Sequence, residues 1–592
     1  MNSDSAGASV PQHDPMTRQA DRLLVATGRR GGWWIWVLAL STMVSAGADI
    51  LLPAALGRAI DALPDGGNLT WALLACAGLI ATMVAGKAIG DIASGASNAR
   101  STSWLRMTLV GHLLAIGPAA TRRFEPGDLV TRVTRNASEA GQVGMTAVMV
   151  GAGLLAPVGG IVALMIIDPW VGLTALAGLV VMAGLLRVFV RNNTETIRGY
   201  LHSQGLIAAR LLDALSGART IAAAGSVAHE RQRILQPLPG LREHGVRMWR
   251  NQVRVTSQAA VIGPLLQLVV VGVAGFGVVA GRLSVGELYA ASRYAILAAG
   301  IGSATGYLNK LARARAGGRR AAEVLNEPVT DYGAGRLPDS PGGGRLEFRG
   351  VRVCAAGEPV IDGFDLVVPP GATVAVVGRS GAGKSLLAAV AGRLADPDQG
   401  QVILDGVALP ELSRAQLRSA VGFAFERPAL VGDTIEEVID FGSRNRTKSN
   451  VRKAAATARA DTFVERLPQG YATELATAPL SGGEIQRLGL ARAFARPYRV
   501  LILDDATSSL DAVTEQQVGN VLAGGDSGQT RLIIAHRAAT AARTDLVAWL
   551  DRGRVRSLRP HRELWLDPEY RALFGAEAAP AAHCTQPMGV PA

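Results

Sequence analysis

Two short segments in the second half of the chain combine glycine, lysine, serine and aspartate at spacings suited to phosphate and metal chemistry. The first, GRSGAGKS, follows the apolar run TVAVVG and precedes the helical pattern LLAAVAGRL. Its glycines let backbone N–H groups curl around phosphates at a helix N-terminus. Lys384 supplies charge for the β- and γ-phosphate oxygens, and Ser385 supplies a hydroxyl for Mg²⁺. The expected phosphate-binding residues are Gly378, Arg379, Ser380, Gly381, Ala382, Gly383, Lys384 and Ser385.

The second segment, RVLILDD, places Asp504 and Asp505 directly after an aliphatic run that is typical of a buried parallel strand. At the carboxyl end of such a strand, Asp504 can hold Mg²⁺ through water, and Asp505 falls where a residue would orient or deprotonate the attacking water. A further strand, RLIIAHR, ends at His536, which is placed to contact the γ-phosphate. Lys384, Asp505 and His536 are therefore the expected catalytic residues, with ATP and Mg²⁺ as cofactors.

A third segment identifies a family. PLSGGEIQRLGLARAF, at 479–494, resembles the signature sequence of ABC ATPases, and SSLD at 508–511 follows the aspartate strand as it does in that family. Ser481-x-x-Glu484 also fits a helix capping box. The resemblance covers about 346–575 and implies a dimer with two ATP molecules held between nucleotide-binding domains. The residues that it implies for contact with nucleotide are Ser481, Gly482, Gly483, Glu484 and Asp511.

Three positions depart from the family pattern. Cys354 and Ala355 stand in the region where the family usually has an aromatic ring that stacks on adenine. Glu426 stands in GFAFERPALVGDTI at the position of a glutamine that reaches the magnesium, so we expect it, with Ser385 and Asp504, to be a metal ligand. Asp505 replaces a glutamate, and a misplacement of about 1 Å can lower a rate on the order of 100-fold. We therefore expect this chain's own ATP site to hydrolyse slowly.

The elements that must position these residues lie in the second half of the chain, and the first half is rich in long apolar stretches. The chain has 592 residues, of which 49% are hydrophobic and 18% charged. Stretches that reach the roughly 20 residues of a bilayer span occur at 33–57, 71–93, 144–167, 170–190, 256–280 and 284–308. The fold class expected is an all-α transmembrane domain of six helices followed by an α/β P-loop ABC ATPase domain. The whole chain thus resembles a half-transporter of the ABC exporter type.

Arginine sets the expected topology. The net charge of +12 comes mostly from arginines that gather before the first span and in the long connections 94–143 and 191–255. By the positive-inside rule, both termini and these connections are cytoplasmic, in the cytoplasmic membrane of a bacterium. This location also argues against a nucleic-acid partner. The long connections have helical apolar spacing, which predicts membrane helices that continue into the cytoplasm, and small inserted domains are the alternative.

The expected domain boundaries are 1–30 for a cytoplasmic N-terminal segment, 31–325 for the transmembrane domain, 326–345 for a linker rich in Gly and Pro, 346–575 for the nucleotide-binding domain and 576–592 for a flexible tail. Three cysteines lie far apart and support neither a disulfide framework nor a zinc site. Asp49 and Arg293 fall inside spans, where an ionisable group marks either substrate contact or a pair between the two.

We expect ATP-driven export by this chain as one half of an ABC dimer. In the family, a chain with a degenerate site beside an intact signature typically pairs with a different subunit, so the expected partner is a second half-transporter, with membrane lipid around both. The substrate is open: APLSGGEIQRLGLARAF resembles transporters found beside lanthipeptide-type pathways, which suggests a modified peptide, whereas lipids and hydrophobic small molecules remain alternatives. An ATP-gated channel or regulator is a further alternative, and a soluble ABC ATPase that acts on nucleic acid is a remote one.

Overall fold

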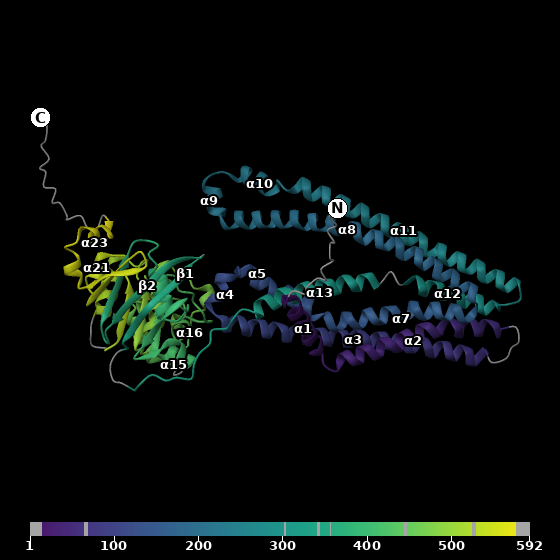
Figure 1. Ribbon diagram of the computed structural model, residues 1–592, viewed down its shortest axis with the longest axis horizontal. Coiled ribbons are helices and arrows are strands. Elements are labelled where there is room, and N and C mark those ends of the chain that lie inside the picture. Colours follow the sequence, from purple (N-terminus) through teal and green to yellow (C-terminus); the bar gives the residue numbers. More distant parts are fainter. Residues whose placement is uncertain are drawn as a thin grey trace, which may run out of the picture. The chain divides into compact units, whose positions relative to one another are not determined.

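The computed structural model describes residues 15–63, 69–300, 304–339, 344–355, 357–442, 447–523 and 528–575. These residues form two compact units, one within 15–115 and 124–328, and one within 116–123 and 329–575 (Figure 1). The tail expected at 576–592 and the first part of the N-terminal segment, 1–14, lie outside the described residues.

The first unit is helical throughout its regular elements, as the apolar pattern predicts. Its long helices are α1 (Pro15–Arg29), α2 (Trp34–Asp61), α3 (Leu69–Ile116), α7 (Val143–Ile167), α8 (Pro169–Ser216), α11 (Leu238–Val279), α12 (Val285–Ala299) and α13 (Ala304–Leu325). Shorter helical segments are α5 (Pro126–Thr131), a π-helical turn (Arg132–Asn136), α6 (Ala137–Gly141), α9 (Ala218–Ala223) and α10 (Val227–Leu235). The prediction of a helical membrane domain is confirmed.

Several of these helices have apolar stretches as long as a membrane span. Within the part of the chain that the structure describes, three helical stretches are long and apolar enough to cross a membrane: Trp34–Asp61, Leu69–Ile116 and Pro126–Ile167. Among the described residues of α8 and α11, the apolar stretches are Pro169–Val180 and Gly263–Val279. The predicted spans 71–93, 144–167, 170–190 and 256–280 begin inside α3, α7, α8 and α11, whereas 33–57 and 284–308 begin one residue before α2 and α12.

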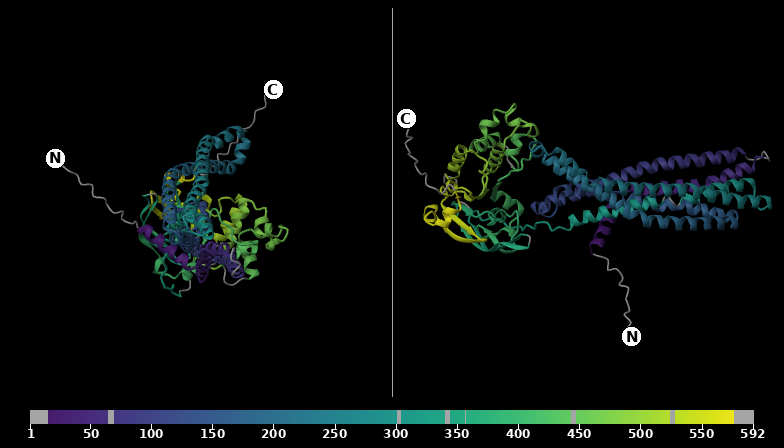
Figure 2. Two further views of the ribbon diagram at one scale, coloured as in Figure 1. Left: turned by 90° about the vertical axis from the view of Figure 1, so that its right-hand side faces the viewer. Right: turned by 90° about the horizontal axis from the view of Figure 1, so that it is seen from above.

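Helices α8 and α11 continue far beyond their apolar ends. Helix α8 has 48 residues, which at about 1.5 Å per residue is far more than the roughly 30 Å of a bilayer core. It lies side by side with α11, and α9 and α10 connect the two (Figures 1 and 2). The long connection therefore consists of helix extensions, and the alternative of a small inserted domain is wrong for this segment.

The ends of α2 and α12 are joined by polar contacts. The carboxylate of Asp61 accepts hydrogen bonds from Ser284 Oγ at 2.6 Å and from the backbone N–H of Gly286 at 2.8 Å. Ser284 and Glu287 form the capping box that the sequence predicts at the start of α12. Further along, Tyr294 Oη donates to the carbonyl of Ile50 at 2.7 Å. These contacts fix α12 against α2 along much of its length.

The second unit combines two sheets with surrounding helices. The strands are β1 (Leu346–Ala355), β2 (Glu358–Val368), β3 (Thr373–Gly378), β4 (Gln399–Leu404), β5 (Val407–Ala408), β6 (Val421–Ala424), β7 (Val500–Asp504), β8 (Thr530–Ile534), β9 (Leu546–Asp551) and β10 (Arg554–Arg559). One sheet has the order β2-β1-β4-β5 and is antiparallel. The other has the order β10-β9-β3-β8-β7-β6, and its pairs from β9 to β6 are parallel.

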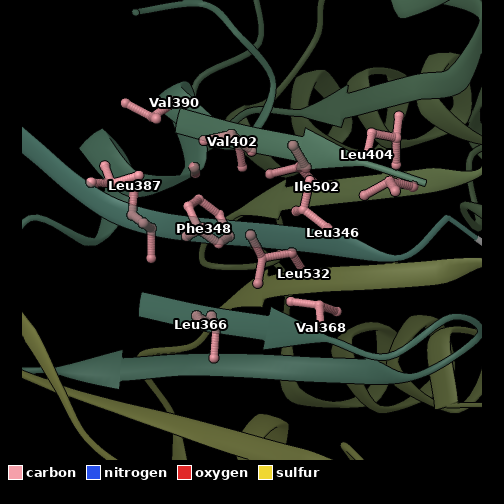
Figure 3. Close-up of a cluster of buried hydrophobic side chains, with 14 of the residues drawn as sticks. Leu346, Phe348, Leu366, Val368, Leu387, Val390, Val402, Leu404, Ile502 and Leu532 are labelled. Carbon is pink, nitrogen blue, oxygen red and sulfur yellow. The ribbon is translucent and has the colours of Figure 1, made fainter. Parts of the chain in front are cut away.

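The helices of this unit are α4 (Pro118–Arg123), α14 (Lys384–Ala391), α15 (Arg414–Ala420), α16 (Ile435–Ile439), α17 (Lys448–Thr457), α18 (Asp461–Val464), α19 (Gly482–Phe494), α20 (Ala512–Ala523), α21 (Ala538–Ala541), α22 (His561–Leu564) and α23 (Pro568–Ala572). A buried cluster joins the two sheets and α14 (Figure 3). Phe348 of β1 and Leu387 of α14 contribute to it together with Ile502 of β7 and Leu532 of β8. The α/β ATPase domain predicted after the membrane domain is thereby confirmed.

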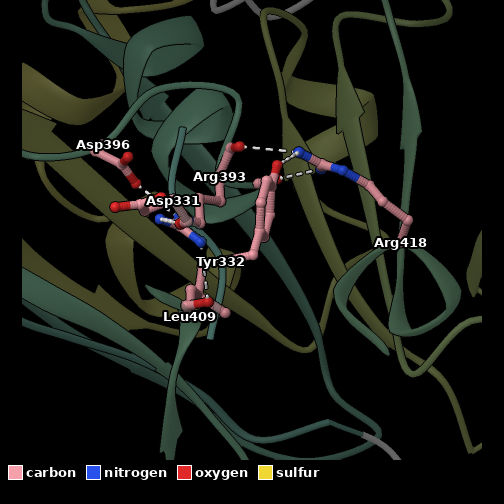
Figure 4. A network of polar contacts seen from close by, with 7 residues as sticks. Asp331, Tyr332, Arg393, Asp396, Leu409 and Arg418 are labelled. Carbon is pink, nitrogen blue, oxygen red and sulfur yellow. Dashed lines mark hydrogen bonds and ion pairs between the residues drawn. The ribbon is translucent and has the colours of Figure 1, made fainter. Parts of the chain in front are cut away.

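Residues between the last membrane helix and β1 are held by two arginines (Figure 4). Arg393 donates to the carbonyl of Asp331 and to the carboxylate of Asp396 at 2.8 Å, and its guanidinium lies 4.6 Å from the ring centre of Tyr332. Arg418 donates to Tyr332 Oη at 3.2 Å. Part of the segment expected as a linker at 326–345 is therefore anchored to the second unit.

Candidate functional site

Four neighbouring parallel strands place predicted site residues at one edge of the larger sheet. In the order β3-β8-β7-β6, each strand is followed at its carboxyl end by a predicted site residue. The phosphate loop follows β3, His536 comes after β8, Asp504 ends β7, and Glu426 comes two residues after β6. Ligands of open α/β sheets bind at such an edge. Segments more than 150 residues apart in sequence are thus brought together by strand order alone.

The phosphate loop has a backbone that glycine makes possible. Gly381 and Gly383 have φ of 81° and 91°, a region that L side chains rarely adopt. A Cβ on Gly383 would also come within 3.0 Å of Val360. Gly383 is the N-cap of α14, so the backbone N–H groups at the start of this helix are directed at the loop. The predicted strand, loop and helix are all present.

Lys384 is buried among backbone carbonyls. Its ammonium donates to the carbonyl oxygens of Gly378 at 2.9 Å and Arg379 at 3.0 Å, and the side chain is 5% exposed. Burial lowers the pKa of Lys384, although the charges of Asp505 and Asp504 oppose the shift. A buried ammonium held by neutral carbonyls fits a polyphosphate, whose charge would compensate it.

A hydroxyl and several carboxylates face this lysine. Ser385 Oγ donates to Asp504 Oδ1 at 2.9 Å, which brings the two predicted metal ligands into contact. Burial raises the pKa of Asp504, and the charge of Glu426 adds to this, whereas the Ser385 hydrogen bond opposes it. Hydroxyl and carboxylate oxygens are the donors that Mg²⁺ prefers. The residues present therefore fit MgATP.

Asp505 occupies a backbone conformation that favours its residue type. Its φ is 48°, in the left-handed region, where Asp and Asn are several-fold enriched over other non-glycine residues. Burial raises the pKa of its carboxyl, the charges of Glu426 and Asp504 act in the same direction, and His536 opposes them. The carboxylate is one bond, about 1.5 Å, shorter in reach than that of a glutamate. An aspartate therefore suits the backbone of the turn after β7.

The signature segment caps its own helix. Ser481 is the N-cap of α19, and Ser481 and Glu484 form the predicted capping box, with Ser481 N donating to Glu484 Oε2 at 2.8 Å. Partial burial acts to raise the pKa of Glu484, but hydrogen bonds from Ser481 and the charge of Arg487 outweigh it and leave the pKa lowered. Asp511 is a similar case, since its carboxylate accepts from the N–H groups of Val513 and Thr514 at the start of α20. Gly482 and Gly483 form the first turn of α19 between these groups.

Gln486 is a site residue that the sequence prediction missed. Its amide group donates to the carbonyls of Glu426 at 3.1 Å and Asp505 at 3.3 Å, and to Ser508 Oγ at 3.2 Å. Its carbonyl accepts from the N–H of Ser509 at 2.8 Å, and the side chain is 2% exposed. The signal was present, because Gln486 lies one turn before the apolar Leu490 on the buried face of α19. A polar residue on such a face requires partners.

Hydrogen bonds and charge interactions bring six predicted site residues into one group: Lys384, Ser385, Asp504, Asp505, Glu426 and His536. Ser481, Glu484 and Asp511 make capping contacts within their own segments instead. Gln486 links the two sets through backbone atoms of Glu426 and Asp505. In the region of the missing aromatic residue, the N–H of Cys354 donates to Asp398 at 2.6 Å, and Ala356 lies outside the described residues.

Comparison with known proteins gives two family matches. Residues 361–508 match the family described as ABC transporter, and residues 35–299 match the family described as ABC transporter transmembrane region. The chain is 47% identical over 537 residues to the ABC transporter ATP-binding protein RamA of Streptomyces coelicolor, across 91% of this chain and 84% of that protein. It is 32% identical to the mycobactin import ATP-binding/permease protein IrtB of Mycolicibacterium smegmatis, across 69% of this chain and 71% of that protein.

A solved structure extends the likeness to the fold. A bacterial Atm1-family ABC exporter with ATP bound superposes with a TM-score of 0.77 at 23% sequence identity. The match covers 95% of this chain and 99% of that one. Both units therefore have the fold of an ABC exporter half.

Proposed function

Because this chain belongs to the ABC transporter family, with a transmembrane region fused to a nucleotide-binding domain in one half-transporter, we propose that it exports a substrate across the bacterial cytoplasmic membrane as one subunit of a heterodimer. ATP-driven transport follows from the family. The direction, the partner and the substrate are our proposal. The clusters of arginine before the first span and in the long connections support cytoplasmic termini.

The observation that carries the heterodimer is Asp505. An aspartate in a left-handed turn, shorter by about 1.5 Å than a glutamate, stands at the position of the base. A homodimer would place this residue in both ATP sites and leave no well-positioned base in either. The signature helix keeps its Ser-Gly-Gly start and its capping box. It can therefore complete a site on a partner that carries a glutamate.

Each residue of the chain's own site has a proposed role. Lys384 and the N–H groups of the phosphate loop bind the β- and γ-phosphates, and Ser385, Asp504 and Glu426 hold Mg²⁺. When bound, the metal supplies charge neutralisation between the phosphate oxygens. Asp505 orients water poorly, and His536 contacts the γ-phosphate from the end of β8. Ser481, Gly482 and Gly483 bind the γ-phosphate of an ATP on the partner, and Glu484 and Asp511 fix the helix ends beside it.

The proposed substrate is a modified peptide, on the strength of the signature segment's resemblance to transporters beside lanthipeptide-type pathways. One relative is named for mycobactin import, so the direction has to be measured. Uptake of substrate into inside-out vesicles that stops without ATP hydrolysis supports export. ATP-gated flux that continues without hydrolysis would replace the proposal with a channel or regulator.

The heterodimer is tested with purified proteins. The chain alone, reconstituted in lipid, is expected to hydrolyse ATP slowly, and addition of its partner half-transporter should raise the rate on the order of 100-fold. In the complex, glutamine at the partner's glutamate should remove that gain. A chain that hydrolyses ATP as fast alone as in the complex would contradict the proposed partnership.

A further inference from the structure

A charged cavity lies within the membrane unit. Its walls come from α2, α3, α7, α12 and α13, and its volume is about 520 Å³, within the range of small-molecule sites. Asp49 lines it from near the middle of the 28-residue helix α2. An ionisable side chain at such a depth is costly unless it faces a cavity or a partner, and such positions mark transport pathways.

The charges in this cavity are unequal. Lys87 and Asp91 lie one turn apart on α3, where they can compensate each other, whereas Asp49 comes from a different helix. Among the residues that the structure describes, none of these three side chains forms an ion pair or a hydrogen bond. The alternative that Asp49 pairs with Arg293 is thus not realised. The cavity is therefore lined by two carboxyl side chains and one amino side chain.

Two prolines add hydrogen-bond acceptors to the same walls. Pro53 lies inside α2 and Pro157 inside α7, and proline has no N–H to donate to the carbonyl four residues earlier. Those carbonyls belong to Asp49 and Gly153, and both residues line the cavity. Each helix therefore has one backbone carbonyl without its helical N–H donor, in a residue that lines the cavity. Helices α2 and α7 thus share this feature at the same cavity.

We infer that this cavity binds the protonated amine of an amphiphilic molecule. A primary ammonium has three donors and no acceptor, which matches the carboxylate of Asp49 and the carbonyls of Asp49 and Gly153. The apolar body of the ligand contacts Met149, Ile296 and Leu297. The inference rests on the proposed transport function, because it assigns the chemical class of the transported substrate: an amphiphile with an amine, as a peptide with a free amino group would be.

The test measures binding without nucleotide to the full-length chain in lipid nanodiscs, with empty nanodiscs as reference. Three probes share one dansyl-alkyl body and carry a primary ammonium, a trimethylammonium or an N-acetyl group. The primary amine is expected to bind at least about tenfold more tightly than the acetyl probe, since hydrogen bonds to a charged group are the strong ones. The trimethylammonium probe should fall between them, because it keeps the charge and loses the donors.

Variants assign the effect to the cavity. Asp49→Asn should remove the preference for the amine over the acetyl probe, and Pro157→Ala, which restores an N–H for the Gly153 carbonyl, should narrow the gap between the amine and trimethylammonium probes. Glu243→Gln changes an exposed carboxylate on α11 and should leave all three affinities unchanged. Equal binding of the amine and acetyl probes, or an unchanged preference in Asp49→Asn, would overturn the inference. Probe binding with no transport would instead contradict only the proposed export.

Discussion

The carboxyl groups at the phosphate-binding edge of the ATPase unit and at its signature helix have pKa values shifted in opposite directions. At the edge, burial raises the pKa of Asp504 and of Asp505, the charge of Glu426 adds to both shifts, and the charge of Asp504 adds to the shift of Asp505. At the signature helix, hydrogen bonds from Ser481 and the charge of Arg487 outweigh partial burial and lower the pKa of Glu484. A bound cation would therefore stabilise the carboxylates at the edge. The carboxylate of Glu484 is already stabilised by groups of its own helix.

Under the proposed function, this difference separates nucleotide binding from catalysis within one chain. The edge keeps the phosphate loop, Lys384 and Ser385, and departs from the family at Asp505, Glu426 and Cys354. The signature helix shows no such departure in Leu480 to Glu484. A chain that binds its own nucleotide without rapid hydrolysis, and completes a second site elsewhere, would have this combination.

The largest expected effect is that of Ser481→Arg. A guanidinium at the start of α19 removes the cap and fills the space proposed for the partner's γ-phosphate, so ATPase activity of the assembled complex should fall more than about 100-fold. Ser413→Arg is the matched control, because Ser413 caps α15 in the same way. It should cost only about 1 kcal/mol of stability. Full activity of the Ser481→Arg complex would place the signature helix outside any ATP site.

Lys384→Ala should weaken ATP binding at this chain's own site by about 10- to 100-fold, because it removes a charge-assisted contact to the phosphates. Fluorescent-ATP titration of the purified chain measures the change. Turnover by the complex should fall less than binding at this site, since the partner's site still operates. Unchanged affinity in the variant would show that nucleotide binds elsewhere.

Gln486→Ala breaks the link between the two regions. The N–H of Ser509 loses its acceptor and the carbonyls of Glu426 and Asp505 lose a donor. The expected cost is about 1–3 kcal/mol of unfolding free energy for groups left unsatisfied, measured by chemical denaturation. Gln416→Ala is the control, because it changes the same residue type on a helix outside this network. Equal stability of the two variants would mean that Gln486 does not hold these loops.

The smallest effect concerns acidity. A metal ligand must be ionised, and burial raises the pKa of Asp504 with help from the charge of Glu426. As the pH falls towards this raised pKa, Asp504 becomes protonated and MgATP binding should weaken. This loss should occur at a higher pH than it would for an aspartate with an ordinary pKa. Glu426→Gln removes one cause of the shift, so the acidic limit of binding should move to lower pH in an affinity titration. A limit that stays in place would show that Glu426 lies too far from Asp504 to matter.

Local motifs account for what the sequence could predict here. The phosphate loop, the aspartate strand and the capping boxes at Ser284 and Ser481 depend on residues a few positions apart, and all appear in the structure. The meeting of Lys384 with Asp504 follows from the general rule that carboxyl ends of parallel strands share an edge.

Long-range and conformational features were beyond such patterns. The partners of Gln486 lie between 19 and 60 residues away, and the anchoring of Asp331 by Arg393 spans 62 residues. The left-handed backbone of Asp505 depends on the turn after β7, which no propensity reveals. The membrane cavity could not be predicted from the sequence. The residues four positions before Pro53 and Pro157 line the same cavity only because α2 and α7 pack together.

The central claim, that Asp505 is not a working base, is tested most directly at that residue. ATPase rates of the purified chain in lipid are compared for the parent, Asp505→Asn and Asp505→Glu, with nucleotide affinity measured in parallel to confirm that each protein binds ATP. The account predicts that the parent hydrolyses ATP slowly and that Asp505→Asn changes this rate by no more than about twofold. Asp505→Glu should increase the rate by up to roughly 100-fold, the gain expected when the carboxylate is correctly placed. A fast parent whose rate collapses in Asp505→Asn would show that Asp505 performs catalysis and would contradict the account.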